Sequence, residues 1–171
     1  MTLERRFAAA MSMDDATWLR HANPLSVWTR ASVLPLVILA VWSREWFGPW
    51  SWAAIAVSIA WMWVNPRIFR RPESMDNWAS RGVLGERVWL NRDVVPVPRR
   101  HRIAPHVLNG VTAIGTAFVV WGLVTLNVWP TLLGSVLVYC GKLWFLDRMV
   151  WLYEDVIAQN EHYRSWLDCG R

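Results

Sequence analysis

Residues 107–126 read VLNGVTAIGTAFVVWGLVTL, a run of 20 residues without a single charge. At a rise of about 1.5 Å per residue, a helix of this length spans the ~30 Å hydrocarbon core of a bilayer. A second apolar run, Val128–Leu146, follows directly after Asn127, and two others, Val27–Phe47 and Trp50–Val64, precede both of them. The pattern predicts four membrane-spanning helices.

Basic residues are distributed unevenly among the segments that connect these runs. The chain contains 18 Lys and Arg residues, of which only Arg44 lies in a turn expected outside, whereas nine lie between the second and third runs. Lys and Arg next to membrane spans are retained in the cytoplasm, so both termini are expected inside. We therefore expect a multi-pass protein of the bacterial or archaeal cytoplasmic membrane.

Tryptophan is abundant, with 15 residues, and many of them lie near the expected membrane boundaries. An indole ring is apolar but carries one hydrogen-bond donor, so it favours the headgroup level of a bilayer. A soluble protein with a Trp-rich core is the alternative, and it is disfavoured by the long uncharged runs. The indoles expected around the outer turns are Trp42, Trp46, Trp50, Trp52 and Trp129.

The net charge of +5 and the pI near 10.0 raise the question of an anionic partner. Because the basic residues flank membrane spans, anionic lipid headgroups at the inner face are expected, and nucleic acid is not. A homo-oligomer or a second membrane protein is a further partner compatible with the sequence. The expected headgroup contacts are Arg67, Arg70, Arg71, Trp78, Trp89, Arg99 and Arg100.

The predicted fold class is an all-α, four-helix transmembrane bundle made of two hairpins. Asn23-Pro24 is a typical helix start, and the absence of Gly and Pro between Asp147 and Trp166 predicts a fourth helix that projects into the cytoplasm. The segments are an N-terminal cytoplasmic segment (1–23), hairpin 1 (24–64), a basic interfacial cytoplasmic loop (65–106), hairpin 2 (107–146), and a cytoplasmic helix extension and tail (147–171).

Helix contacts and interruptions follow from Pro and from small residues. Pro35 should interrupt the first span, because it lacks an N–H. A short helix within 72–89 is expected to lie on the membrane surface with its Trp and Leu side chains in the lipid. Small residues permit close helix packing, and the expected contact positions are Ala56 and Ala60 in the second span, Gly110, Ala113 and Ala117 in the third, and Gly134, Val138 and Gly141 in the fourth.

Polar residues are concentrated at the predicted inner boundary, where they need partners or water and often mark function. Asp147 and Arg148 are expected to pair with loop residues rather than with each other, and Lys142 either reaches the headgroups or pairs with a carboxylate. The candidate network comprises His21, Asn23, Asn65, Glu86, His101, His106, Lys142, Asp147, Arg148, Glu154 and Asp155, with Glu161 and His162 beyond it.

The polar stripe of the fourth helix has three interpretations: a solvated charged helix end, a structural polar network, and a metal or catalytic site. The first is favoured, because no HxxxH or ExxH pair occurs in the sequence. No metal site and no cofactor are therefore predicted. Cys140 and Cys169 are isolated thiols at different expected depths, so no disulfide framework is predicted either.

Four segments carry a resemblance to a known family: HANPLSVWTR at 21–30, NPRIF at 65–69, WASRGVLGER at 78–87 and KLWFLDRMVW at 142–151. Together they resemble a family of small Trp-rich prokaryotic four-span membrane proteins classed as a domain of unknown function. The resemblance covers about residues 15–165. It implies a membrane protein, and it implies no activity, cofactor or catalytic residue.

The function favoured by the sequence is that of a binding or accessory membrane protein that uses its inner-face polar network. The alternative is a small membrane enzyme, with or without a metal, acting on a lipid or quinone-like substrate at the inner interface. A third candidate is a subunit of an oligomeric transporter. The absence of charges from the middle of each apolar run disfavours the transporter.

Overall fold

The computed structural model describes residues 15–93, 96–158 and 163. Every regular element in these residues is helical, which confirms the all-α prediction. The elements are α2 (Asp15–His21), α3 (Pro24–Ala31), α4 (Val33–Trp42), α5 (Arg44–Phe47), η1 (Gly48–Trp50), α6 (Ser51–Ile68), α7 (Trp78–Leu90), η2 (Arg99–His101), α8 (Ala104–Thr125) and α9 (Val128–Ile157).

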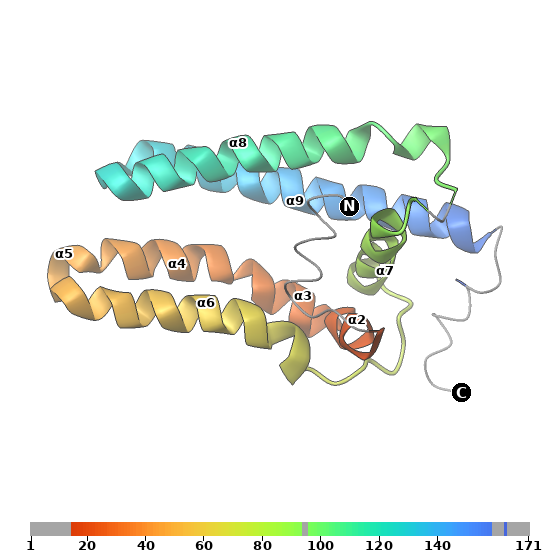
Figure 1. Ribbon diagram of the computed structural model, residues 1–171, viewed down its shortest axis with the longest axis horizontal. Helices are drawn as coiled ribbons and strands as arrows, with labels where there is room; N and C mark the ends of the chain where they lie inside the picture. Colours follow the sequence, from red (N-terminus) through yellow and green to blue (C-terminus); the bar gives the residue numbers. More distant parts are fainter. Residues whose placement is uncertain (1–14, 94–95, 159–162, 164–171) are drawn as a thin grey trace.

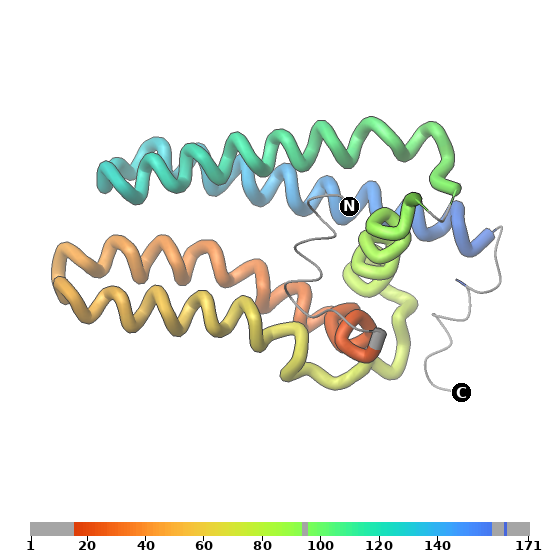
Figure 2. Tube along the Cα trace, in the orientation of Figure 1, coloured from red at the N-terminus to blue at the C-terminus, as the bar shows by residue number. Residues whose placement is uncertain are grey.

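Two antiparallel helical hairpins lie one above the other, and α7 lies between them at one end (Figure 1). The trace in Figure 2 shows the same two layers, with α4 and α6 in one and α8 and α9 in the other. Three helical stretches are long and apolar enough to cross a membrane: Pro24–Ile68, Arg99–Thr125 and Val128–Ile157. The first of these turns back at Gly48, whose φ of 52° is readily adopted by glycine.

The first hairpin begins where the sequence predicts. Asn23 caps α3 by accepting a hydrogen bond from the backbone N–H of Leu25, and Pro24 follows as the first helical residue. The helix is interrupted at Ser32, between α3 and α4, shortly before Pro35, as expected from a proline that cannot donate to the preceding turn.

The contact face of α6 differs from the expected one. Ala56 and Ala60 are exposed, so the prediction that they form a close helix contact is wrong. The buried positions are instead Ser51, Ser58, Asn65 and Pro66. The first three recur every seven residues and therefore share one face of the helix.

The second hairpin is packed through glycines. A β-carbon on Gly115 would lie 2.8 Å from the carbonyl oxygen of Gly134, and one on Gly134 would lie 2.5 Å from that of Gly115. Gly141 packs against α8 in the same way, so the expected contact at Gly134 and Gly141 is confirmed. The expected stripe on the third span is wrong: Gly110 faces open space, and the buried face carries Gly115, Val119 and Gly122.

Helix α7 confirms the expectation of a short helix in this segment but not its position on the membrane surface. It crosses α9, where Gly82 meets Leu146 and Gly85 lies directly against the backbone of Met149. Trp89 is 2% exposed and belongs to the core rather than to a lipid-facing surface. The buried core at this end comprises Trp18, Ala22, Met75, Val83, Leu84, Val88, Trp89, Val97, Leu108, Phe145, Met149, Leu152, Tyr153 and Val156.

The last helix, α9, is continuous through Asp147 and ends at Ile157. The predicted extension beyond the apolar run is therefore present over its first ten residues or so. Its expected continuation to Trp166, including Glu161 and His162, lies outside the described residues.

Candidate inner-face cavity

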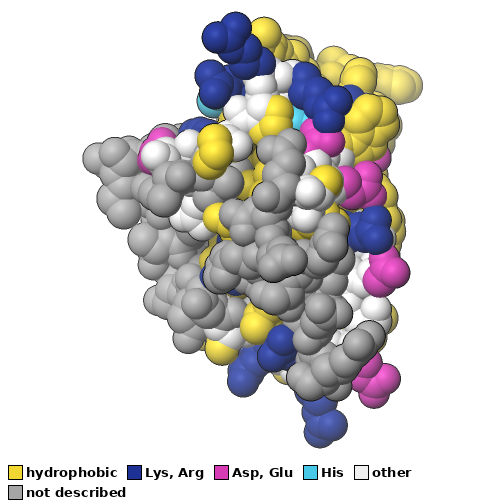
Figure 3. Space-filling model, turned by 90° about the vertical axis from the view of Figure 1, so that its right-hand side faces the viewer, with side chains coloured by type: hydrophobic (Ala, Val, Ile, Leu, Met, Phe, Trp, Pro, Cys, Tyr) yellow, Lys and Arg dark blue, Asp and Glu magenta, His cyan; other side chains and the backbone are white. Residues whose placement is uncertain are grey.

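The polar residues singled out by the sequence lie at the end of the molecule where α2 and α7 pack, away from the turn at Gly48. Figure 3 looks at this end, where Lys and Arg side chains are visible near the top and the bottom, and Asp and Glu side chains lie mainly along the right-hand side. They do not form one continuous network in the described residues. They form separate groups, each with its own contacts.

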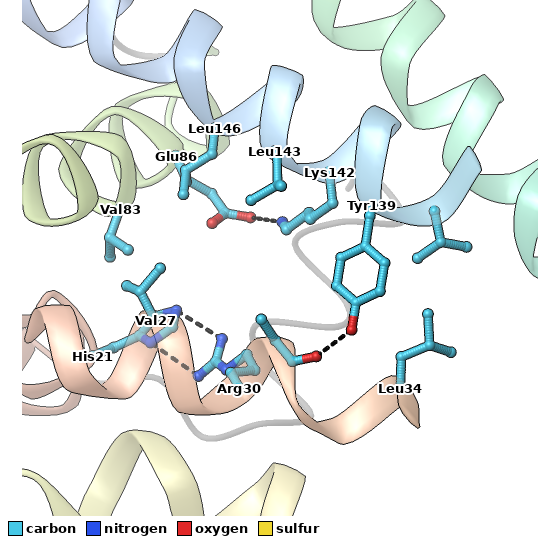
Figure 4. Close-up of a pocket in the computed structure, with 12 residues that line it drawn as sticks. His21, Val27, Arg30, Leu34, Val83, Glu86, Tyr139, Lys142, Leu143 and Leu146 are labelled. Atoms are coloured by element: carbon cyan, nitrogen blue, oxygen red, sulfur yellow. Dashed lines mark hydrogen bonds and ion pairs between the residues drawn. The ribbon is translucent and has the colours of Figure 1, made fainter. Parts of the chain in front are cut away.

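A cavity of about 170 Å³ lies at the junction of the two hairpins (Figure 4). A single water needs about 10–15 Å³ on this scale, so the cavity accommodates a much larger group. It is lined from α2, α3, α4, α7 and α9 by His21, Val27, Arg30, Ala31, Leu34, Val83, Glu86, Val138, Tyr139, Lys142, Leu143 and Leu146.

One wall of the cavity carries an ion pair between α7 and α9. The Nζ atom of Lys142 lies 3.0 Å from Oε1 of Glu86. This answers the question left open by the sequence: Lys142 pairs with a carboxylate of another segment. The sequence also predicts that Arg148 pairs with a carboxylate of the 65–106 loop such as Glu86, and this is wrong, because Glu86 pairs with Lys142.

The opposite wall carries His21 and Arg30 in close contact. The two terminal nitrogens of Arg30 lie 2.8 and 2.9 Å from Nε2 and Nδ1 of His21. Burial, and then the positive charges of Arg30 and Lys142, hold the pKa of His21 well below its ordinary value of 6.5. His21 is therefore neutral at pH 7, and the cavity is lined by two cations and one anion.

Tyr139 lines the side of the cavity that lies nearer the turn at Gly48. The hydroxyl of Tyr139 on α9 donates to the carbonyl oxygen of Ala31 at 2.6 Å, which joins the two hairpins. Leu34 lies beside this bond (Figure 4), and Val138, the residue before Tyr139, also lines the cavity. The cavity is thus lined by both charged and apolar side chains.

Asn23 and Asn65 have structural roles in the first hairpin. The buried side chain of Asn65 accepts from Ser26 at 2.9 Å and donates to Thr29 at 2.8 Å. The Nδ2 group of Asn23 donates to the carbonyl oxygen of Arg70. These bonds satisfy buried polar atoms and hold α6 against α3.

A second group of polar contacts joins α7 to α9. Arg81 lies 2.7 Å from Glu154 and 2.5 Å from Asp76. Asp147 accepts from Nε1 of Trp78 at 3.3 Å.

The expectation that Asp147 and Arg148 do not pair with each other is wrong, because Nη2 of Arg148 lies 3.4 Å from Oδ2 of Asp147. Helical neighbours point about 100° apart, but the long arginine side chain reaches back to the carboxylate.

A third group surrounds Asp155 on α9. Its two carboxylate oxygens contact Arg100 and the Nε2 atom of His101. His101 is buried, and Arg100 is exposed. His106 is not part of this group: its ring packs edge-on against Trp89, with 5.3 Å between the ring centroids.

The expected headgroup contacts are only partly at the surface. Arg70, Arg71, Arg99 and Arg100 are exposed. Arg67 stacks over Trp63 at 3.9 Å, and Trp78 stacks against Trp28 at 5.9 Å. Because Trp89 is in the core, it is not available to lipid.

No group of three or more His, Cys, Asp or Glu side chains suited to a metal ion occurs in the part of the chain that the structure describes. Arg30 and Tyr139 line the cavity but are not among the site residues predicted from the sequence. Each has a polar group within an apolar run: Arg30 carries a charge near the start of the first run, and Tyr139 carries a hydroxyl inside the fourth.

Comparisons with known proteins agree with the resemblance found in the sequence. A family model described as a family of unknown function, DUF6653, matches residues 2–167. Neither the curated proteins nor the solved structures contain a match to this chain. Because the family model covers nearly all of the sequence, this chain belongs to the family of unknown function DUF6653.

Proposed function

We propose that this protein is a four-span membrane protein with both termini in the cytoplasm, and that it binds an amphipathic ligand in the inner-face cavity. Support for the spans comes from the three long apolar helical stretches, the first of which turns back at Gly48. Support for the orientation comes from the arginines, which are concentrated at the end that carries α7.

Topology is tested by fusing reporters that are active on one side of the membrane at residues 48, 85, 128 and 171. The expected result is an external signal at 48 and 128 and a cytoplasmic signal at 85 and 171. An external signal at 85 or 171 would contradict the orientation.

The observation that carries the binding proposal is that the same cavity is lined by charged and by apolar side chains. The charged ones are Arg30, Lys142 and Glu86, and apolar side chains lie on both sides of them along the hairpins: Val27, Leu143 and Leu146 nearer α7, and Leu34 and Val138 nearer the turn at Gly48. Leu34 and Val138 are four residues from Arg30 and Lys142, which corresponds to about 6 Å along the membrane normal. The side of the cavity beyond the charged residues, toward the hydrocarbon core, is therefore apolar, which suits an amphiphile of the inner leaflet.

A second groove, of about 530 Å³, lies between α8 and α9 and also has Arg side chains at one end. Its two cations already have carboxylate partners, since Arg100 contacts Asp155 and Arg148 contacts Asp147. The inner-face cavity contains Arg30, for which the described residues provide no carboxylate within ion-pair distance. We therefore assign the ligand to the inner-face cavity.

The test is native mass spectrometry of the purified protein and of two matched variants. Val138→Trp fills the cavity, whereas Val136→Trp makes the same change on an exposed position of α9. The wild type and Val136→Trp should retain a bound small amphiphile, and Val138→Trp should lose it. Equal retention by both variants would show that the ligand does not occupy this cavity.

A further inference from the structure

We infer that the ligand of the inner-face cavity is a phospholipid whose phosphate is bound by Arg30, with Lys142 next to it. This rests on the proposed function and adds the chemical class of the ligand. It differs from general attraction of the protein surface to anionic lipid, because it assigns the recognition to one guanidinium between the hairpins.

Hydrogen-bond donors exceed acceptors around Arg30. A neutral imidazole has one acceptor nitrogen and one N–H, so only one of the two contacts between Arg30 and His21 is a hydrogen bond, and the other brings two donors together. The Nε–H of Arg30 is buried and has no acceptor in the described structure. A ligand with several acceptor oxygens would satisfy these groups.

The charges point to the same ligand. Glu86 lies 3.0 Å from Lys142 and also attracts the charge of Arg30 across the cavity, but no ion pair among the described residues gives Arg30 a carboxylate in direct contact. A buried cation is costly unless it is paired and hydrogen-bonded. A guanidinium binds phosphate through two parallel N–H donors, a geometry that an ammonium group does not offer.

The size of the cavity excludes a whole lipid and fits its headgroup. About 170 Å³ is smaller than the roughly 300–1,000 Å³ of sites that enclose a complete small molecule. The acyl chains would leave past Leu34 and Val138 into the bilayer. A free phosphate ion would satisfy Arg30 but would make no use of these apolar walls.

The experiment compares two lipids with identical chains, phosphatidic acid and diacylglycerol, which lacks the phosphate, by titrating each into the full-length protein in neutral detergent micelles. The variants are Arg30→Gln, Arg30→Lys and, as a matched control, Arg70→Gln, which removes an exposed charge at the same end. Melting curves of each variant report folding. Inorganic phosphate and glycerol phosphate serve as competitors without chains.

In the wild type and in Arg70→Gln, phosphatidic acid should bind at least about tenfold more tightly than diacylglycerol, as charge-assisted hydrogen bonds to the phosphate imply. Arg30→Gln should abolish this preference, and Arg30→Lys should retain part of it. The preference should persist at 0.5 M salt, because a buried pair is screened less than a surface pair. The soluble competitors should displace lipid only at concentrations far above that of the lipid.

Three results would overturn the inference. Equal binding of phosphatidic acid and diacylglycerol by the wild type would show that the phosphate is not recognised, while the proposal of an amphiphile site would stand if Val138→Trp removed both. Equal losses in Arg30→Gln and Arg70→Gln would indicate surface attraction. Full displacement by inorganic phosphate at lipid-like concentrations would identify a free anion as the occupant. If the wild type bound neither lipid, the proposed function itself would be contradicted.

Discussion

The hydroxyl of Tyr139 on α9 donates to the carbonyl oxygen of Ala31 at the end of α3, at 2.6 Å. The residue four positions after Ala31 is Pro35, which has no N–H and cannot provide the helical hydrogen bond to that carbonyl. Tyr139 therefore supplies, from the other hairpin, the donor that the proline removes. The carbonyl group that the helix interruption leaves without a helical donor is thus the one through which Tyr139 joins the two hairpins.

Tyr139→Phe should lower the free energy of unfolding by about 1–3 kcal/mol, because it leaves a carbonyl without a donor at an apolar site. The measurement is thermal or denaturant unfolding in detergent. Pro35→Ala provides the control, since it restores the N–H within the helix. In the Pro35→Ala background, Tyr139→Phe should cost much less, and equal costs in the two backgrounds would contradict this account.

Glycine substitutions should separate the crossing of α7 and α9 from ordinary helix propensity. A β-carbon on Gly85 would overlap the carbonyl group of Met149, so Gly85→Ala should destabilise the protein by about 1–3 kcal/mol or more. Gly110 faces open space, and Gly110→Ala should be neutral or stabilising by up to about 1 kcal/mol. Unfolding midpoints compare the two variants, and a similar change in both would show that α7 does not cross α9 closely.

Carboxylates on α9 should differ in their contribution to stability. Asp155 is the acceptor for buried His101 and for Arg100, whereas Asp147 is more exposed and contacts Trp78 and Arg148 at 3.3 and 3.4 Å. Asp155→Asn should therefore cost more than Asp147→Asn, by about 1–3 kcal/mol, because a buried polar group loses its partner. Melting of both variants at one pH makes the comparison. Equal effects would place His101 outside the core.

The pH dependence of stability should report on His21. In the folded protein, burial and the charges of Arg30 and Lys142 hold the pKa of His21 below 6.5, and Glu86 is the acidic group that lines the same cavity. Below about pH 6.5 the unfolded chain therefore binds a proton that the folded chain does not, so stability is lost as the pH falls. The slope from this group is at most about 1.4 kcal/mol per pH unit.

His21→Gln removes this contribution, so its melting temperature should vary less than that of the wild type between pH 7.5 and 5. The difference between the two proteins is the relevant quantity, because the other titratable groups are common to both. Parallel pH profiles would show that His21 is not held neutral in the fold.

The sequence predicts features that depend on one helix at a time. The start at Asn23-Pro24 and the interruption near Pro35 follow from local backbone chemistry, and the structure confirms both of them. Features that depend on which face meets a neighbour were less predictable. Gly110 and Gly115 are both helical glycines, and only the packing partner distinguishes them.

In the candidate site too, the sequence indicates single residues but not their contacts. Lys142 and Glu86 were recognisable as isolated charges near the predicted boundary, but their pairing depends on how α7 crosses α9. Arg30 contacts His21, which lies nine residues earlier in another helix, and it shares the cavity with Lys142 of the opposite hairpin. These relationships arise from tertiary packing, which no period in the sequence specifies.

The proposed function requires that one amphiphile occupies the cavity between the hairpins. The most direct test places a photoreactive amino acid at Leu34, which lines the cavity, and at Leu39, which is exposed on the same helix, and irradiates native membranes. The account predicts a single adduct, of phospholipid mass, at position 34 and a mixture that reflects the bulk membrane lipids at position 39. The same mixture at both positions, or no adduct at position 34, would contradict it.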